Sequence, residues 1–275
     1  MTVATINASV ASHRAGRQAL LWVVPLTAAW FAISYGLPAL QASGIPTATS
    51  RLFVHVLTAL GLWLGLERTE LSVAQRRNVW LAVMVPYTLW VGVAWSAAIN
   101  GLFKPGAVPL PLTPIAIFLP VIVGVPILLL SKRLGQVLDA MPATWLVALQ
   151  LYRVLGMTFI VGWLYGRVPG IFALPAGIGD VMTGLMAVPT AVWLASGGPE
   201  ARRAAIGWNV FGLLDFAIAV GLGLVTVPGP FQLIVPSIPN ATAGVYPTVL
   251  IPAFAVPSSI LLHVLSLRQL RRRAR

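Results

Sequence analysis

The sequence predicts an all-α, polytopic integral membrane protein, a bundle of about eight transmembrane helices with both termini in the cytoplasm. Of 275 residues, 58% are hydrophobic and only 9% are charged, whereas about a quarter of a soluble domain is charged. The apolar runs are long and continuous, which favours helices over the alternating strands of a membrane barrel. Finally, the loops between the apolar runs alternate between many and few basic residues.

Eight apolar runs of about 20 residues each predict the spans. They cover approximately residues 18–40, 47–66, 78–100, 114–131, 143–166, 171–195, 204–225 and 245–267. The first run follows a short basic segment, residues 1–17, and is too long for the core of a cleaved signal peptide, so we expect it to remain as an anchor. Prolines 247, 252 and 257 predict a kinked or broken eighth span. We expect one transmembrane domain over residues 1–275 and no soluble domain.

The loop charges set the expected topology. With eight spans, 14 of the 18 basic residues lie on the side of the termini, Arg51, Lys104 and Arg167 lie on the other side, and Arg153 lies within a span. Cytoplasmic loops are enriched in Lys and Arg, so this asymmetry predicts cytoplasmic termini in a bacterial-type inner (plasma) membrane. The tail 268–275 would anchor against anionic lipid. This placement explains the net charge of +12, and we expect no nucleic-acid partner.

Three charges within the spans form the candidate site: Arg153, Asp180 and Asp215. A charge at bilayer depth costs at least about 2.5 kcal/mol and indicates function by default. From the helical rise, Arg153 and Asp180 lie about 20 Å and 13 Å from the outer face, and Asp215 about 16 Å from the inner face. The three groups can therefore meet at similar depth, because consecutive helices are usually neighbours.

Helical spacing places small or polar side chains beside each of these charges. The faces read Gln150, Arg153 and Met157 in the fifth span, Gly177, Asp180, Gly184 and Ala187 with adjacent Thr183 in the sixth, and Trp208, Gly212, Asp215 and Ala219 in the seventh. Small residues let helices approach closely in lipid. Gln150, Thr183 and Asn209 complete the candidate ligand or proton site, with Asn209 nearer the cytoplasmic side.

An arginine retains its proton at this depth and therefore requires a partner. If Arg153 pairs with one acid, that acid stays ionised and the other is free to bind a proton, as in a proton-coupled carrier. The alternative is a cluster that only fixes helix packing.

Arg51, His55 and Arg167 are candidates for an outer mouth. Arg51 and His55 are one helical turn apart near the outer end of the second span. Arg167 opens a Pro- and Gly-rich loop, after which we expect the sixth helix to start near Ala176. Its first amides would then face a cavity near Asp180 and suit an anion or the negative end of a small-molecule ligand.

The sequence Gly177-Ile178-Gly179-Asp180 resembles the Gly-x-Gly-Asp motif of intramembrane aspartyl proteases. The resemblance implies two catalytic carboxylates that share a proton, with Asp215 as the second. The order differs, because the other acid precedes the motif in those families and follows it here.

No cofactor and no metal site are expected. Cysteine is absent and histidine occurs only three times. His55 and His263 fall near opposite membrane faces, so they cannot form one site. No phosphate-binding loop, dinucleotide fingerprint or nucleophile elbow is present.

The leading hypothesis is a small-solute or proton-coupled carrier, with Arg153 as counter-ion or substrate anchor and the two acids as proton or cation sites. Two alternatives remain open: a membrane-embedded enzyme acting on a lipid or isoprenoid-like substrate, and a structural or accessory membrane subunit.

Overall fold

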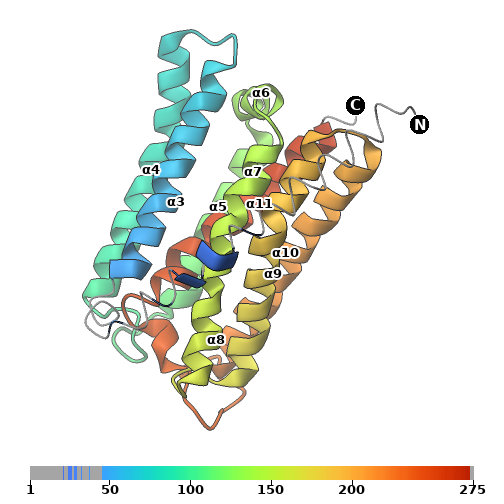
Figure 1. Ribbon diagram of the computed structural model, residues 1–275. Coiled ribbons are helices and arrows are strands. Elements are labelled where there is room, and N and C mark those ends of the chain that lie inside the picture. The colour runs from blue at the N-terminus through green and yellow to red at the C-terminus, as the bar shows by residue number, and fades with distance from the viewer. Residues whose placement is uncertain are drawn as a thin grey trace.

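The structure is a computed structural model that describes residues 45–272 and a few isolated positions between 21 and 37. The described residues form helices and loops without strands, which confirms the all-α prediction. The long helices run roughly side by side (Figure 1). The first expected span, residues 18–40, lies outside the continuously described chain, as do residues 1–17 and 273–275.

Helices α3 (Ile45–Glu67) and α4 (Val73–Ile99) form a pair along one side of the molecule (Figure 1). The start of α4 is set by a capping box: the Ser72 hydroxyl accepts from the Gln75 amide, and the Gln75 side chain accepts from the Ser72 amide. This arrangement satisfies two N–H groups that a helix start leaves free. Further along the pair, Trp80 Nε1 donates to the Ala59 carbonyl at 3.0 Å.

Helix α5 (Leu112–Leu130) is followed by the short helix α6 (Lys132–Ala140), which lies across one end of the bundle (Figure 1). Ser131 separates them. Its amide donates to the Ile127 carbonyl at the end of α5, and its hydroxyl accepts from the Leu134 amide at the start of α6. The fifth expected span follows as three segments, α7 (Thr144–Leu149), the 3₁₀ helix η1 (Gln150–Gly156) and α8 (Met157–Leu164).

Helix α9 (Gly170–Ala195) packs against α7, η1 and α8, and against α10 (Pro199–Thr226). The expected late start near Ala176 is wrong. The Pro169 carbonyl accepts from the amides of Phe172 and Ala173, so the helix begins at Gly170. Asp180 therefore lies about three turns inside α9, and the helix N-terminus does not provide an anion site beside it.

The chain from Val227 to Leu250 contains one short 3₁₀ turn, η2 (Ala241–Gly244), and leads into a π-helical turn, η3 (Ile251–Ala255). Helix α11 (Val256–Arg272) continues from η3. A π turn at this point agrees with the prolines that predicted a break in the last span. Helix α11 contacts α5, α6, α7 and α10, and its span is the most buried of the candidate membrane helices.

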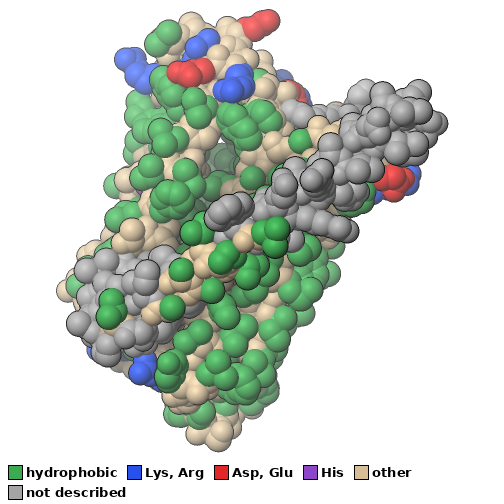
Figure 2. Space-filling view, in the orientation of Figure 1, with side chains coloured by type: hydrophobic (Ala, Val, Ile, Leu, Met, Phe, Trp, Pro, Cys, Tyr) green, Lys and Arg blue, Asp and Glu red, His purple; other side chains and the backbone are tan. Residues whose placement is uncertain are grey.

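Seven helices in the described part of the chain are long and apolar enough to cross a membrane. They are Thr49–Glu67, Val73–Ile99, Leu112–Leu130, Thr144–Leu164, Gly170–Ala195, Pro199–Thr226 and Ile251–Arg272. Large apolar side chains such as Leu119, Ile122 and Leu214 are exposed on their outer faces. Hydrophobic side chains cover much of the visible flank, and most visible charged side chains gather at one end (Figure 2). The molecule is thus helical and apolar, as a membrane protein is.

Candidate functional site

The middle of the fifth span is a 3₁₀ helix rather than an α-helix, and it carries Arg153. A 3₁₀ stretch inside a longer helix often marks a functional hinge or local strain. Arg153 is only 2% exposed. Its long side chain is therefore committed to contacts inside the bundle.

The Arg153 guanidinium joins four acceptors on three helices. Its Nε donates to Asp180 Oδ1 on α9 at 2.7 Å, and its Nη2 forms an ion pair with Asp215 on α10. Its Nη1 lies 3.2 Å from the Gly212 carbonyl and 3.1 Å from His263 Nε2 on α11. The planar group also lies over the Phe216 ring, with 3.8 Å between the guanidinium carbon and the ring centroid. Both acids bond to Arg153, whereas the sequence suggested that one would remain separate.

His263 extends this cluster into α11. Its Nε2 faces a guanidinium N–H, so this nitrogen must accept a hydrogen bond. Its Nδ1 lies 2.9 Å from Asn209 Oδ1 and must therefore donate, because the Asn209 amide nitrogen donates to the Ala205 carbonyl and the Ser266 hydroxyl. The network thus assigns His263 as the neutral imidazole with the proton on Nδ1.

Glycines allow the helices to approach closely enough for these bonds. A Cβ atom at Gly179 would lie 1.7 Å from Asp215 Oδ1, and one at Gly156 would lie 2.3 Å from the Asp180 Cβ. A Cβ at Gly212 would lie 2.6 Å from the His263 ring and 2.9 Å from Arg153 Nη1. Of these three glycines, only Gly212 belongs to a face predicted from the sequence; Gly156 and Gly179 do not.

Three of the remaining candidate residues lie nearby with different roles. Asn209 joins the cluster through His263. Gln150 is fully buried and donates to the Ser259 carbonyl at 3.1 Å. The Thr183 hydroxyl donates to the Gly179 carbonyl within α9 at 2.8 Å, so it bonds to its own helix rather than to Arg153.

The expected outer patch of Arg51 and His55 is wrong. Arg51 is 5% exposed and lines a small internal cavity together with Tyr152, Arg153 and Asp180. His55 stacks on the Tyr87 ring at a centroid distance of 4.9 Å and hydrogen bonds with Thr88, so it belongs to the α3–α4 contact. Arg51 is thus buried inside the bundle and the partly exposed His55 lies against α4, a difference that depth along the chain does not reveal.

Arg167 differs from these two residues. It is exposed in the connection between α8 and α9, where its guanidinium lies 5.5 Å from the centroid of the Tyr165 ring. It does not reach the charged cluster.

Sequence reasoning missed His263 as a member of the site. Depth along the chain places His263 near a membrane face, but Ser259, His263 and Ser266 follow the i, i+4, i+7 spacing of one helix face. That polar stripe on an apolar helix was the available signal. All three are buried, at 1% exposure or less.

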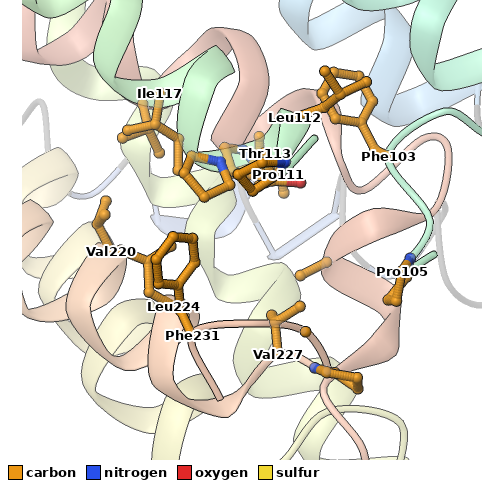
Figure 3. Close-up of a pocket in the computed structure, with 18 of the residues that line it drawn as sticks. Phe103, Pro105, Pro111, Leu112, Thr113, Ile117, Val220, Leu224, Val227 and Phe231 are labelled. Carbon is orange, nitrogen blue, oxygen red and sulfur yellow. The ribbon is translucent and has the colours of Figure 1, made fainter. Parts of the chain in front are cut away.

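A larger cavity of about 420 Å³ leads to the same cluster. We call it the apolar cavity. Its walls come from the α4–α5 loop, α5, α8, α9, α10 and the segment after α10. Figure 3 shows Ile117 and Pro111 on one side and Val220, Leu224 and Phe231 on the other. Asp180 borders both this cavity and the small cavity beside Arg153.

The described residues offer hydrogen bonds and charge at this site rather than metal ligands. Within residues 45–272, no three side chains of His, Asp or Glu converge to hold a metal ion. The arrangement can hold a buried ion-pair network on one side of Asp180 and an apolar molecule on the other.

Comparison with curated proteins and with solved structures finds no match. Comparison with family models matches residues 110–271, which include α5 to α11, Arg153, both acids and His263. Because the match covers more than half of the sequence, the chain belongs to the family described as "Domain of unknown function (DUF8737)".

Proposed function

We propose that the chain is a small-solute carrier of a bacterial-type inner membrane, with both termini in the cytoplasm and Asp180 as the group at which proton and solute binding are coupled. The observation that carries this proposal is the position of Asp180. It lines the apolar cavity and is also bonded to Arg153. A cavity of about 420 Å³ falls within the usual range of about 300–1,000 Å³ for small-molecule sites.

The ion pair supplies a physical route for coupling. Protonation of Asp180 would remove its charge and weaken the contact between α9 and η1, where Arg153 sits. Because η1 interrupts the span as a 3₁₀ segment, this contact lies where the fifth span can most easily bend. The charge state of Asp180 would in this way alter the packing around the cavity.

The test is solute uptake by proteoliposomes under an imposed pH gradient. A defined mixture of small alcohols, amines and acids is offered, and retained solutes are quantified by mass spectrometry. We expect wild-type protein to accumulate at least one solute, and Asp180→Asn to lose the dependence on the gradient. Asp215→Asn should behave in the same way, because it breaks the same network.

A second variant distinguishes loss of transport from loss of folding. Val220→Trp would fill the apolar cavity without touching an ion pair. We expect this variant to fold and to lose uptake. Normal uptake by Val220→Trp would contradict the proposal. If Asp180→Asn and Asp215→Asn fail to fold while Val220→Trp transports normally, the cluster serves packing only.

The largely apolar lining favours a membrane-embedded enzyme for a lipid or isoprenoid-like substrate as the second candidate. In that case the same proteoliposomes would convert a lipid into a product of new mass and would accumulate nothing. The proteolytic version has less support, because the Arg153 guanidinium bonds to both carboxylates, whereas aspartyl proteases need the two acids to share a proton.

A further inference from the structure

The apolar cavity has very few charged groups along its walls. Among the described residues that line it, only Lys104 and Asp180 carry charge. Lys104 is exposed in the α4–α5 loop, whereas Asp180 lies deep in α9. The cavity therefore offers a ligand mainly apolar walls and one buried carboxylate.

That carboxylate retains an unused acceptor. Asp180 Oδ1 accepts from Arg153 Nε, and among the described residues no group donates a hydrogen bond to Oδ2. The Asp180 side chain is 15% exposed, compared with 5% for Asp215 and 1% for Arg153. Asp180 lines the apolar cavity and Arg153 does not, so a ligand there meets the carboxylate rather than the guanidinium.

The net charge of the buried residues around Asp180 determines whether a charged or a neutral hydrogen-bond donor is favoured in the cavity. Arg51 and Arg153 are both buried and always charged. Asp180 and Asp215 oppose them, and His263 is neutral in the hydrogen-bond network. The other four acids of the chain, Glu67, Glu70, Asp139 and Glu200, lie in or near the connections between helices. Among the described residues, the buried cluster thus carries two positive and two negative charges.

A charged ligand would upset this balance in a medium of low dielectric constant. An unpaired charge there is costly, so neither an ammonium nor a carboxylate is favoured. An uncharged O–H or N–H donor adds a hydrogen bond to the free acceptor and leaves the net charge at zero.

We infer that the apolar cavity binds a neutral amphiphile, an alcohol whose hydroxyl donates to Asp180 Oδ2 while its hydrocarbon part fills the cavity. This inference rests on the proposed function only in taking the cavity as the solute site. It names the substrate class and requires no transport step.

The test compares three probes with the same eight-carbon chain: 1-octanol, octylamine and octanoate. Binding is measured on purified protein in nanodiscs, and the signal of Val220→Trp is subtracted to remove partition into lipid. We expect 1-octanol to bind about tenfold tighter than the other two, a difference of about 1.4 kcal/mol. If octylamine bound most tightly, the buried cluster would carry an uncompensated negative charge. If octanoate bound most tightly, the cluster would carry an excess positive charge. Either result, or no preference, would overturn the inference.

Asp180→Asn provides a second readout. The variant gives the cluster a net charge of +1, so the preference should move from 1-octanol towards octanoate. An unchanged order would contradict the charge argument. If Asp180→Asn does not fold, the wild-type order with Val220→Trp still decides the question.

Failure of this inference differs from failure of the carrier proposal. Alcohol binding without uptake by proteoliposomes would exclude the carrier and leave the ligand class standing. Uptake without an alcohol preference would exclude only the ligand class.

Discussion

At the scale of residues, the site depends on the shape of the Arg153 side chain as much as on its charge. A guanidinium presents five N–H donors in one plane, and here it reaches two carboxylates, a carbonyl and an imidazole. The sequence predicted that Arg153 and the two acids lie at similar depth, since apolar spans make the charges conspicuous. It did not reveal His263, because one histidine near a helix end resembles an ordinary interface residue.

Arg153→Lys should destabilise the protein although it keeps the charge. A lysine has three donors and no planar fork, so at least one buried acceptor would lose its partner, at a cost of about 1–3 kcal/mol. We expect a thermal unfolding midpoint several degrees lower in detergent. Arg167→Lys is the matched control, because Arg167 is exposed, and it should change little. Equal midpoints for the two variants would show that charge alone suffices at Arg153.

At the scale of elements, close contacts among η1, α9, α10 and α11 bring the charged groups together. Small residues spaced along α9 and α10 predicted which faces meet. The 3₁₀ geometry of η1 was not predicted, since its sequence from Gln150 to Gly156 continues the apolar run without a proline, and Gly156 at its end is one of many glycines in the spans. This segment packs closely against α9, where a Cβ at Gly184 would lie 2.4 Å from the Val154 amide nitrogen.

Gly212→Ala should disrupt the α10–α11 contact. The added methyl group would lie 2.6 Å from the His263 ring, and overpacking of this kind costs about 1–3 kcal/mol. Gly221→Ala on the same helix is the control, since no heavy atom lies within 4 Å of its added Cβ. Retention of the folded, monodisperse fraction after heating, measured by size-exclusion chromatography, should fall for Gly212→Ala alone. A similar loss in both variants would show that any alanine in α10 destabilises the protein, and it would contradict a specific effect at the α10–α11 contact.

At the scale of the whole molecule, the expected membrane topology places successive loops between helices on opposite sides of the membrane. Glu70 lies in the α3–α4 turn, and Ala107 lies in the α4–α5 loop at the opposite end of α4. The distribution of basic residues predicts the first as cytoplasmic and the second as external.

The absence of native cysteine makes this topology directly testable. In intact cells, a membrane-impermeant maleimide should label Ala107→Cys, and it should label Glu70→Cys only after the membrane is opened. Both positions are exposed, so differences in labelling report the side of the membrane. Labelling of Glu70→Cys in intact cells would invert the assigned orientation.

The sequence by itself determined the helical class and showed which charges, Arg153, Asp180 and Asp215, lie within long apolar runs. Charges are costly in apolar helices and therefore rare there, so these three are easy to recognise. Only the tertiary structure decided that both acids share Arg153, that Arg51 is buried, that His263 completes the network and that Asp180 lines an apolar cavity. These features depend on how each helix is rotated and packed against its neighbours. Rotation and packing arise from contacts between residues more than 100 positions apart, such as Arg153 and His263, and no local pattern records them.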